Sequence, residues 1–128
     1  MQYVKRDTEE LKAQGYHKLI AWKVADDFTL STYQLTKKFP KNELFGITSQ
    51  LRRAVLSVPL NIVEGYARNN RNDFRNFLRI SLGSLAEVEY LLKISSQLKY
   101  IDTNEYESLY KKKERAGKLL WKLMKSQS

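Results

Sequence analysis

The sequence predicts an all-α protein, an antiparallel up-down-up-down four-helix bundle, from three observations. Apolar residues recur every three to four positions almost throughout the 128 residues, a period typical of helices rather than strands. Residues that interrupt helices are scarce, with five glycines and two prolines. The polar segments between the periodic stretches are short, so consecutive helices should run in opposite directions.

Each of four long apolar periods predicts one helix, over residues 18–39, 43–67, 71–99 and 103–125. Asp102 is predicted to cap the last helix, and Glu105 three residues later completes a capping box. Residues 1–15 are predicted to form an N-terminal tail or a short extra helix. Residues 16–128 form the single predicted domain, which is long enough to bury one core without disulfides.

Composition argues against several kinds of chemistry. The chain has no cysteine and one histidine, His17, so the usual ligands of structural zinc and iron–sulfur clusters are missing, and no metal or cofactor is predicted. The N-terminal residues lack the apolar run of a signal peptide, and no stretch approaches the ~20 apolar residues of a membrane span. A cytoplasmic protein with no membrane partner is expected.

Three of the predicted helices carry more apolar surface than one bundle can bury, and one of them, helix 71–99, is apolar around most of its circumference. Helix 43–67 has a second apolar line opposite its core stripe, and helix 18–39 repeats this pattern. Such exposed lines usually mark a partner surface, although the N-terminal tail could instead cover the line on helix 43–67. The residues predicted to form an oligomer interface are Leu56, Leu60, Val63, Trp22, Leu30 and Tyr33.

Polar residues follow one face of helix 43–67 at spacings of three and four, beside its core stripe. Antiparallel pairing brings this face to helix 71–99, where Gly83 with Ser84 would allow a close approach of the helices. Arg53 and Glu87 are predicted to form a partly buried ion pair at this seam. The predicted structural network consists of Gln50, Arg53, Ser57, Asn61, Glu64, Ser84 and Glu87.

A general acid–base pair of Glu64 and Glu87 is the alternative interpretation of this polar line. Each glutamate has an arginine within reach of the predicted pairing, and a nearby arginine holds a carboxylate ionised. The chain also offers no nucleophile elbow, phosphate-binding loop or metal-ligand set. No catalytic residue and no enzymatic activity are therefore predicted.

The charge of the chain favours a polyanionic partner. Lysine and arginine number 23 against 14 acidic residues, a net charge of +9. Helix 103–125 carries a stripe of basic residues opposite its apolar side, and helix 71–99 carries a shorter one. A solvated face that only aids solubility is the alternative. The residues predicted to bind nucleic acid are Lys111, Arg115, Lys118, Lys122, Lys125, Arg68, Arg71, Arg75, Arg79 and Lys93.

The run from Ile47 to Ala54, continuing from Ser57 to Gly65, resembles the signature of the four-helix-bundle proteins encoded in intervening sequences of bacterial 23S ribosomal RNA genes. The third helix of that family is matched by Phe74, Phe77, Leu78, Gly83-Ser84-Leu85 and Glu87. The resemblance covers residues 18–125. It implies a homopentamer without established catalytic activity, and kinship with the accessory protein of diversity-generating retroelements, a basic pentamer that partners a reverse transcriptase and its RNA.

The sequence and the resemblance together predict a non-enzymatic, ring-like oligomeric scaffold, a pentamer, that holds RNA or DNA on basic outer faces with weak sequence specificity. The alternative function is a protein-interaction scaffold, such as an accessory subunit of a retroelement reverse transcriptase. A salt-dependent gel shift of the purified protein separates these two functions.

Overall fold

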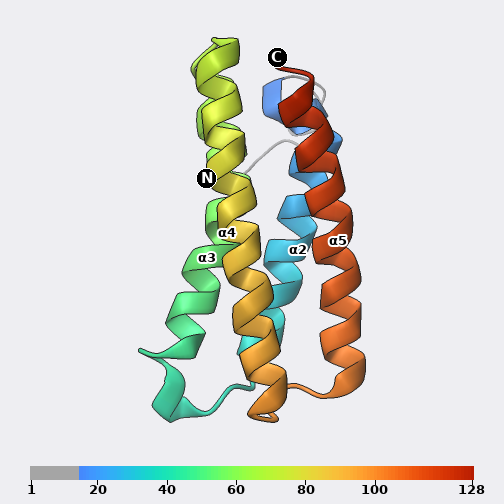
Figure 1. Ribbon diagram of the computed structural model, residues 1–128. Helices are drawn as coiled ribbons and strands as arrows, with labels where there is room; N and C mark the ends of the chain where they lie inside the picture. Colours follow the sequence, from blue (N-terminus) through green and yellow to red (C-terminus); the bar gives the residue numbers. More distant parts are fainter. Residues whose placement is uncertain (1–14) are drawn as a thin grey trace, which may run out of the picture.

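The computed structural model describes residues 15–128, so the tail predicted over residues 1–15 lies outside the described residues apart from Gly15. The described chain is helical (Figure 1). Its elements are η1 (Gly15–Lys18), α2 (Ile20–Thr36), η2 (Lys41–Glu43), α3 (Ile47–Ala67), α4 (Arg71–Gln97) and α5 (Thr103–Lys125). The predicted all-α fold with four long helices is confirmed, and α5 has the predicted bounds.

The four long helices lie side by side, and each runs opposite to the next one in sequence (Figure 1). Two hydrogen bonds between α2 and α3 agree with this opposite direction. The Thr29 hydroxyl donates to the Val55 carbonyl, whereas Thr36, later in α2, accepts from Arg52, earlier in α3. α5 packs against both α2 and α4, which closes the bundle around one apolar core. The largest wholly buried apolar side chains are Phe28, Leu51, Ile62, Leu78, Leu92 and Leu120.

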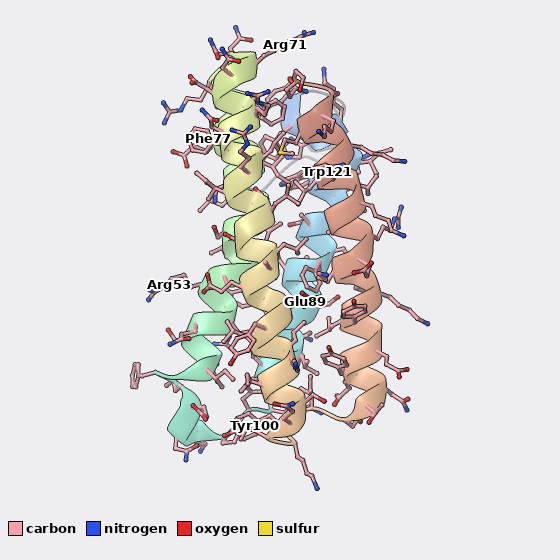
Figure 2. All side chains as sticks on the ribbon, viewed as in Figure 1. Arg53, Arg71, Phe77, Glu89, Tyr100 and Trp121 are labelled. Carbon is pink, nitrogen blue, oxygen red and sulfur yellow. The ribbon has the colours of Figure 1, made fainter. Side chains whose placement is uncertain are left out.

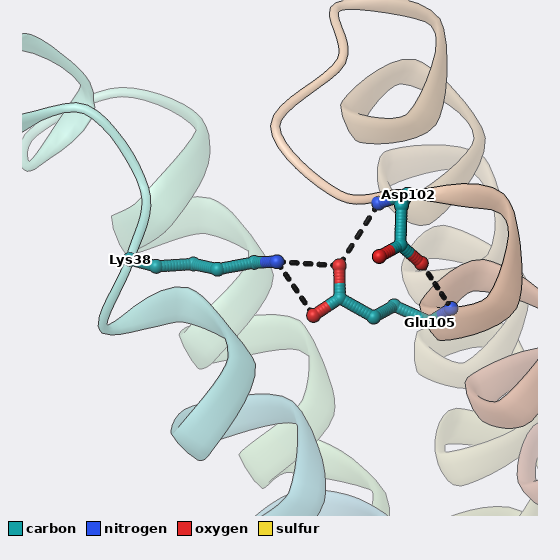
Figure 3. Close-up of polar contacts among 3 residues, drawn as sticks. All are labelled: Lys38, Asp102 and Glu105. Atoms are coloured by element: carbon teal, nitrogen blue, oxygen red, sulfur yellow. Dashed lines mark hydrogen bonds and ion pairs between the residues drawn. The ribbon is translucent and has the colours of Figure 1, made fainter.

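Side chains fix the starts of α4 and α5. Asn70 accepts a hydrogen bond from the Asp73 backbone N–H at 3.0 Å. Asp102 accepts one from the Glu105 backbone N–H at 2.8 Å, and the Glu105 carboxylate accepts one from the Asp102 backbone N–H at 2.9 Å, which confirms the predicted capping box. Lys38, just after α2, also donates to the Glu105 carboxylate (Figure 3). Glu105 therefore joins the end of α2 to the start of α5.

Glu43 links the α2–α3 connection to the α4–α5 connection at this same end of the bundle. Its carboxylate accepts a hydrogen bond from the Ile47 backbone N–H at 3.2 Å, at the start of α3. The Tyr100 hydroxyl, from the segment between α4 and α5, donates to the same carboxylate at 2.7 Å. This hydrogen bond, with partial burial, raises the pKa of Tyr100. The α2–α3 and α4–α5 connections are thereby fixed to each other.

Hydroxyl side chains in the core compensate for a proline inside α3. Pro59 has no backbone N–H, so the carbonyl of Val55, four residues earlier, loses its helical partner. The buried Thr29 hydroxyl lies 3.2 Å from this carbonyl and 2.8 Å from the Ala25 carbonyl of its own helix, so its one proton is shared between the two acceptors. Ser81 of α4, also buried, donates to the Val58 carbonyl at 2.8 Å. The helices on both sides of α3 therefore bond to its backbone near the proline.

The close approach of α3 and α4 occurs at Gly65 rather than at Gly83. A Cβ atom at Gly65 would lie 2.6 Å from the Cβ of Phe77, so only glycine fits there. A Cβ at Gly83 would meet no atom within 4 Å, and Gly83 is exposed. The prediction that Gly83 permits close packing within the chain is wrong, because the helices are rotated so that Ser81 and Ser84 face α3 instead.

Candidate nucleic-acid interface

The outer side of α5 carries a stripe of five basic side chains. Leu109, Ala116 and Leu120 bury the opposite side of the helix in the core, so residues three and four apart on the far side face solvent. All members of the predicted stripe are exposed: Lys111, Arg115, Lys118, Lys122 and Lys125. Lys122 and Lys125 also lie in the last turn, where positive charge interacts favourably with the helix dipole.

Four arginines gather where α3 passes into α4. Arg68 and Arg71 flank the turn, and Arg75 and Arg79 follow on α4, whose tip carries Arg71 (Figure 2). The Arg68 guanidinium lies 5.0 Å from the centre of the Phe77 ring, which holds it beside the turn. The Nε atom of Arg75 is buried and has no hydrogen-bond partner among the described residues. Arg79 donates to Asn76 one turn earlier at 3.3 Å, and Arg68, Arg71 and Arg79 are exposed at this end.

The two groups of basic residues lie at the same end of the bundle (Figure 1). The start of α2, the end of α3, the start of α4 and the end of α5 meet there. Lys18 and Lys23, near the start of α2, add two cations that the sequence pattern did not assign to a site. The acidic residues in these same segments are Glu64 and Asp73, and Asp26 and Asp27 follow one turn after Lys23 on α2. We define the basic end as Lys18, Lys23, Arg68, Arg71, Arg75, Arg79, Lys118, Lys122 and Lys125.

Lys93, Lys111 and Arg115 lie outside the basic end. Lys93 follows Arg79 by fourteen residues on α4, which is roughly 21 Å along a helix axis. Lys111 precedes Lys125 by the same number of residues on α5. The sequence pattern groups Lys93 with the arginines of α4 because they share one side of the helix. In the structure Lys93 is far from these arginines, because residues on the same side of a helix can lie at different distances along its axis.

Other lysines of α5 form ion pairs with acidic residues away from the basic end. Lys112 donates to Asp27 of α2 at 2.7 Å. Lys113 donates to Glu89 of α4 at 2.8 Å and to Glu114 at 3.1 Å. Burial by itself would lower the pKa of Lys113, but the hydrogen bonds to the two glutamates outweigh it and raise the pKa. These lysines therefore bridge helices, whereas the cations of the basic end remain at the surface.

The polar seam between α3 and α4 contains a hydrogen-bonded triad. The hydroxyls of Ser57 and Ser84 lie 2.8 Å apart, and the Asn61 side-chain amide donates to the Ser57 carbonyl at 2.7 Å and to its hydroxyl at 2.9 Å. These three predicted network residues thus fix the register of the two helices. Gln50 is exposed at the start of α3 and lies outside the triad.

The predicted partly buried ion pair of Arg53 and Glu87 is wrong for the single chain. Both side chains are exposed, and no ion pair joins them within the described residues. Arg53 points away from the bundle (Figure 2). Glu64 is also exposed, and its carboxylate lies 3.7 Å from the Arg68 guanidinium. Ser57 and Ser84 occupy the seam itself, and Arg53 and Glu87 lie on its solvent side.

The residues predicted to form an oligomer interface lie along the outer side of α2 and α3. Thr29 and Val55 are in contact, so the residues that follow them, Leu30 and Leu56, lie at the same level. Leu30 is 63% exposed, Leu56 44% and Leu60 53%. The side chains of Trp22, Tyr33 and Val63 are half-buried. We refer to these six residues as the apolar face.

Trp121 is an exposed aromatic residue within the basic end. It lies between Lys118 and Lys125 in sequence and is 51% exposed (Figure 2). The Lys125 ammonium lies 4.8 Å from the centre of its indole ring. The sequence pattern did not single out Trp121, because an aromatic residue at helical spacing more often packs in a core than at a binding surface.

Two further observations bear on the class of protein. Every helix between residues 15 and 128 is too short or too polar to serve as a membrane span. Acidic and histidine side chains of the same range form no cluster of three that could hold a metal ion.

The geometry defines a basic four-helix-bundle protein whose charged end, polar seam and apolar face are its distinctive surfaces. The family model described as 23S rRNA-intervening sequence protein matches residues 17–122, and the chain belongs to this family. The resemblance predicted from the sequence is therefore confirmed at the level of the family.

A solved structure supports the same assignment. It is a protein of unknown function from the S23 ribosomal protein family of Bacteroides thetaiotaomicron, which is 28% identical to this chain with a TM-score of 0.77. The similarity covers 83% of this chain and 96% of the Bacteroides protein. No curated protein sequence matches the chain.

Proposed function

We propose that the protein is a non-enzymatic oligomeric scaffold that binds nucleic acid, RNA or DNA, through its basic end. The observation that carries this proposal is the gathering of nine cations from all four helices and their ends at one end of the bundle, where they outnumber the acidic residues Glu64, Asp73, Asp26 and Asp27. A surface charged in this way attracts a polyanion, and each lysine or arginine that contacts a phosphate releases a counterion.

Binding of this kind has little sequence specificity. Lysine and arginine contacts to phosphates position a nucleic acid but do not read its bases. The cations of the basic end are mounted on rigid helices, so they present a fixed constellation of charge. The shape and flexibility of the nucleic acid, more than its sequence, would then decide how well it fits.

The proposed assembly is a ring-like homopentamer. Support comes from the apolar face, because Leu30, Leu56 and Leu60 are large and exposed in the single chain. Contiguous apolar surface of this kind favours a partner surface. A symmetric assembly would repeat the basic end in every subunit, so several weak phosphate contacts would act together on one nucleic acid.

The proposed absence of catalysis is supported by the position of the two glutamates considered for acid–base chemistry. The contact of Ser57 with Ser84 places Glu87 level with about residue 54 of α3, which is roughly 15 Å along the helix from Glu64. Both carboxylates are exposed. Groups so far apart cannot act on one substrate atom.

The experiment that tests the proposal is a titration of the purified full-length protein with structured RNA, single-stranded DNA and duplex DNA at increasing salt. We expect binding at about 50 mM salt that weakens linearly on a logarithmic scale as salt rises. Light scattering on the same sample gives the mass of the assembly. Absence of binding to all three nucleic acids at low salt contradicts the proposal.

A protein-interaction scaffold, such as an accessory subunit of a reverse transcriptase, is the second candidate. The observation that favours this second candidate is that α4 also exposes large apolar side chains, outside the apolar face. Ile80 is 51% exposed and Tyr90 62% exposed on the outer side of α4. If nucleic acid does not bind the protein alone, these residues and the exposed Arg53 and Glu87 offer a mixed surface to a protein partner.

A further inference from the structure

We propose that Trp121 stacks on an unpaired base, so that the basic end prefers single-stranded nucleic acid, or the unpaired loops of a folded one, to a duplex. This inference rests on the proposed function and names its ligand more closely. Aromatic side chains within a cationic surface are the common device for holding single strands, because every base has a flat face while its phosphates meet the cations.

The position of Trp121 places it among the cations of two helices. Gly117 of α5 lies against Leu85 of α4, and Lys113 of α5 bonds to Glu89 of α4. These two pairs set the antiparallel register, in which each step forward along α5 faces a residue one step earlier on α4. Continuing this register puts Trp121 level with Ser81. Arg79 then lies just beyond Trp121 on α4, toward the same end as Lys125.

The environment of the indole ring leaves room for a base. Helical side chains lean toward the preceding turn, and the residue one turn before Trp121 is Gly117, which has no side chain to cover the ring. The ammonium of Lys125 lies over the ring at 4.8 Å. Lys125 is exposed, and a cation–π contact at an exposed site is weaker than stacking with a base. A base can therefore displace this ammonium, which is then free to contact the phosphate.

Other exposed aromatic residues lack this setting. Tyr90 is exposed on α4, but its neighbours in sequence include Glu87 and Glu89, and it lies away from the basic end. Phe45, in the connection between η2 and α3, is near Glu43 and the opposite end of the bundle. Tyr110 of α5 is 37% exposed and has the Lys113 ammonium 5.1 Å from its ring centre, but Lys113 is paired with Glu89 and Glu114, away from the basic end. Trp121 differs from these three residues because its exposed ring lies among the cations of the basic end.

The test compares ligands that share phosphates and differ in bases. A thymine oligonucleotide, an abasic oligonucleotide of the same length and a duplex are each titrated into the full-length protein. The chain has two tryptophans, so Trp22→Phe leaves Trp121 as the sole indole reporter. We expect the thymine strand to quench its fluorescence, and the abasic strand to bind without comparable quenching.

The variant Trp121→Ala completes the test, with Phe45→Ala as the control, since Phe45 is exposed at the opposite end of the bundle. Trp121→Ala is expected to weaken binding of the thymine strand about fivefold or more, and to leave binding of the abasic strand nearly unchanged. Phe45→Ala should change neither. Equal losses for both strands, no quenching, or a smaller assembly of Trp121→Ala by light scattering would overturn the inference. If wild-type protein binds none of the ligands, the proposed function fails as well.

Discussion

The hydroxyl of Thr29 on α2 lies 3.2 Å from the carbonyl oxygen of Val55 on α3, the carbonyl that Pro59 leaves without a helical partner. Thr29 is buried, so water cannot replace this donor. A leucine or valine in its place would fit the apolar pattern of α2 equally well. The threonine therefore serves a defect in the neighbouring helix in addition to its hydrogen bond with the Ala25 carbonyl of its own helix.

Thr29→Val is expected to destabilise the protein by about 1–3 kcal/mol, because it strands a buried acceptor at nearly constant volume. Chemical denaturation measures the loss. Pro59→Ala restores an N–H four residues after Val55, so the same Thr29→Val change should cost clearly less in the Pro59→Ala background. Equal costs in the two backgrounds would show that the Thr29 hydroxyl does not serve the Val55 carbonyl.

Gly65→Ala is expected to cost about 1–3 kcal/mol, since the new Cβ would lie 2.6 Å from the Cβ of Phe77 and force α3 and α4 apart. The matched control is Gly83→Ala, which meets no atom within 4 Å in the chain. That change should stabilise α4 by about 0.5–1 kcal/mol through helix propensity alone. Thermal unfolding of both variants checks the pair, and a harmless Gly65→Ala contradicts the close packing.

Glu105→Gln is expected to lower stability near neutral pH and to matter little in acid. The backbone hydrogen bond from Asp102, followed by the bond from Lys38, lowers the pKa of Glu105 below its ordinary 4.5. A lowered folded-state pKa gives stability that is present above the unfolded-state pKa and lost as pH falls through the folded-state pKa. Glutamine keeps the cap but not the charge.

Melting temperatures of Glu105→Gln and wild type should therefore converge as pH falls below about 4. Glu107→Gln, an exposed glutamate on the same helix, serves as the control and should differ little from wild type at any pH. A difference between Glu105→Gln and wild type that stays constant from neutral to acid pH would contradict this role of the charge.

Leu60→Glu is expected to reduce the size of the assembly, because it puts a charge in the middle of the apolar face, where Leu60 is 53% exposed in the single chain. Leu98→Glu replaces another leucine, 51% exposed, away from this face and serves as the control. Light scattering should give smaller particles only for Leu60→Glu. Particles of wild-type mass for that variant count against the apolar face as an interface.

Much of the fold follows from the sequence because helix signals are local. The apolar period predicts all four helices, and the capping box at Asp102 and Glu105 places the start of α5. The exposure of Lys118 and Lys122 follows from the same period. These features depend on residues within one or two turns of each other, so a single chain reveals them.

The features that sequence reasoning missed depend on how two helices are rotated against each other. The polar pattern predicts Gly83 and Glu87 at the seam, yet Ser84 and Ser81 face α3 and leave both at the surface. The role of Thr29 appears only when α2 is placed beside Pro59. Likewise, Lys23 joins the basic end through the meeting of helix ends that are distant in sequence.

The most direct test of nucleic-acid binding by the basic end is the dependence of affinity on salt in Lys118→Gln/Lys122→Gln, compared with wild type. The control is Lys37→Gln/Lys41→Gln, which removes two exposed lysines at the opposite end. Glutamine has nearly the helix propensity of lysine, and exposed lysines contribute little stability, so both variants should fold normally. The basic-end variant should bind RNA and DNA more weakly, with a slope of log affinity against log salt shallower by about one unit for each lysine–phosphate interaction removed. The control should keep the wild-type slope. Identical slopes for wild type and both variants would contradict the claim that the basic end holds the nucleic acid.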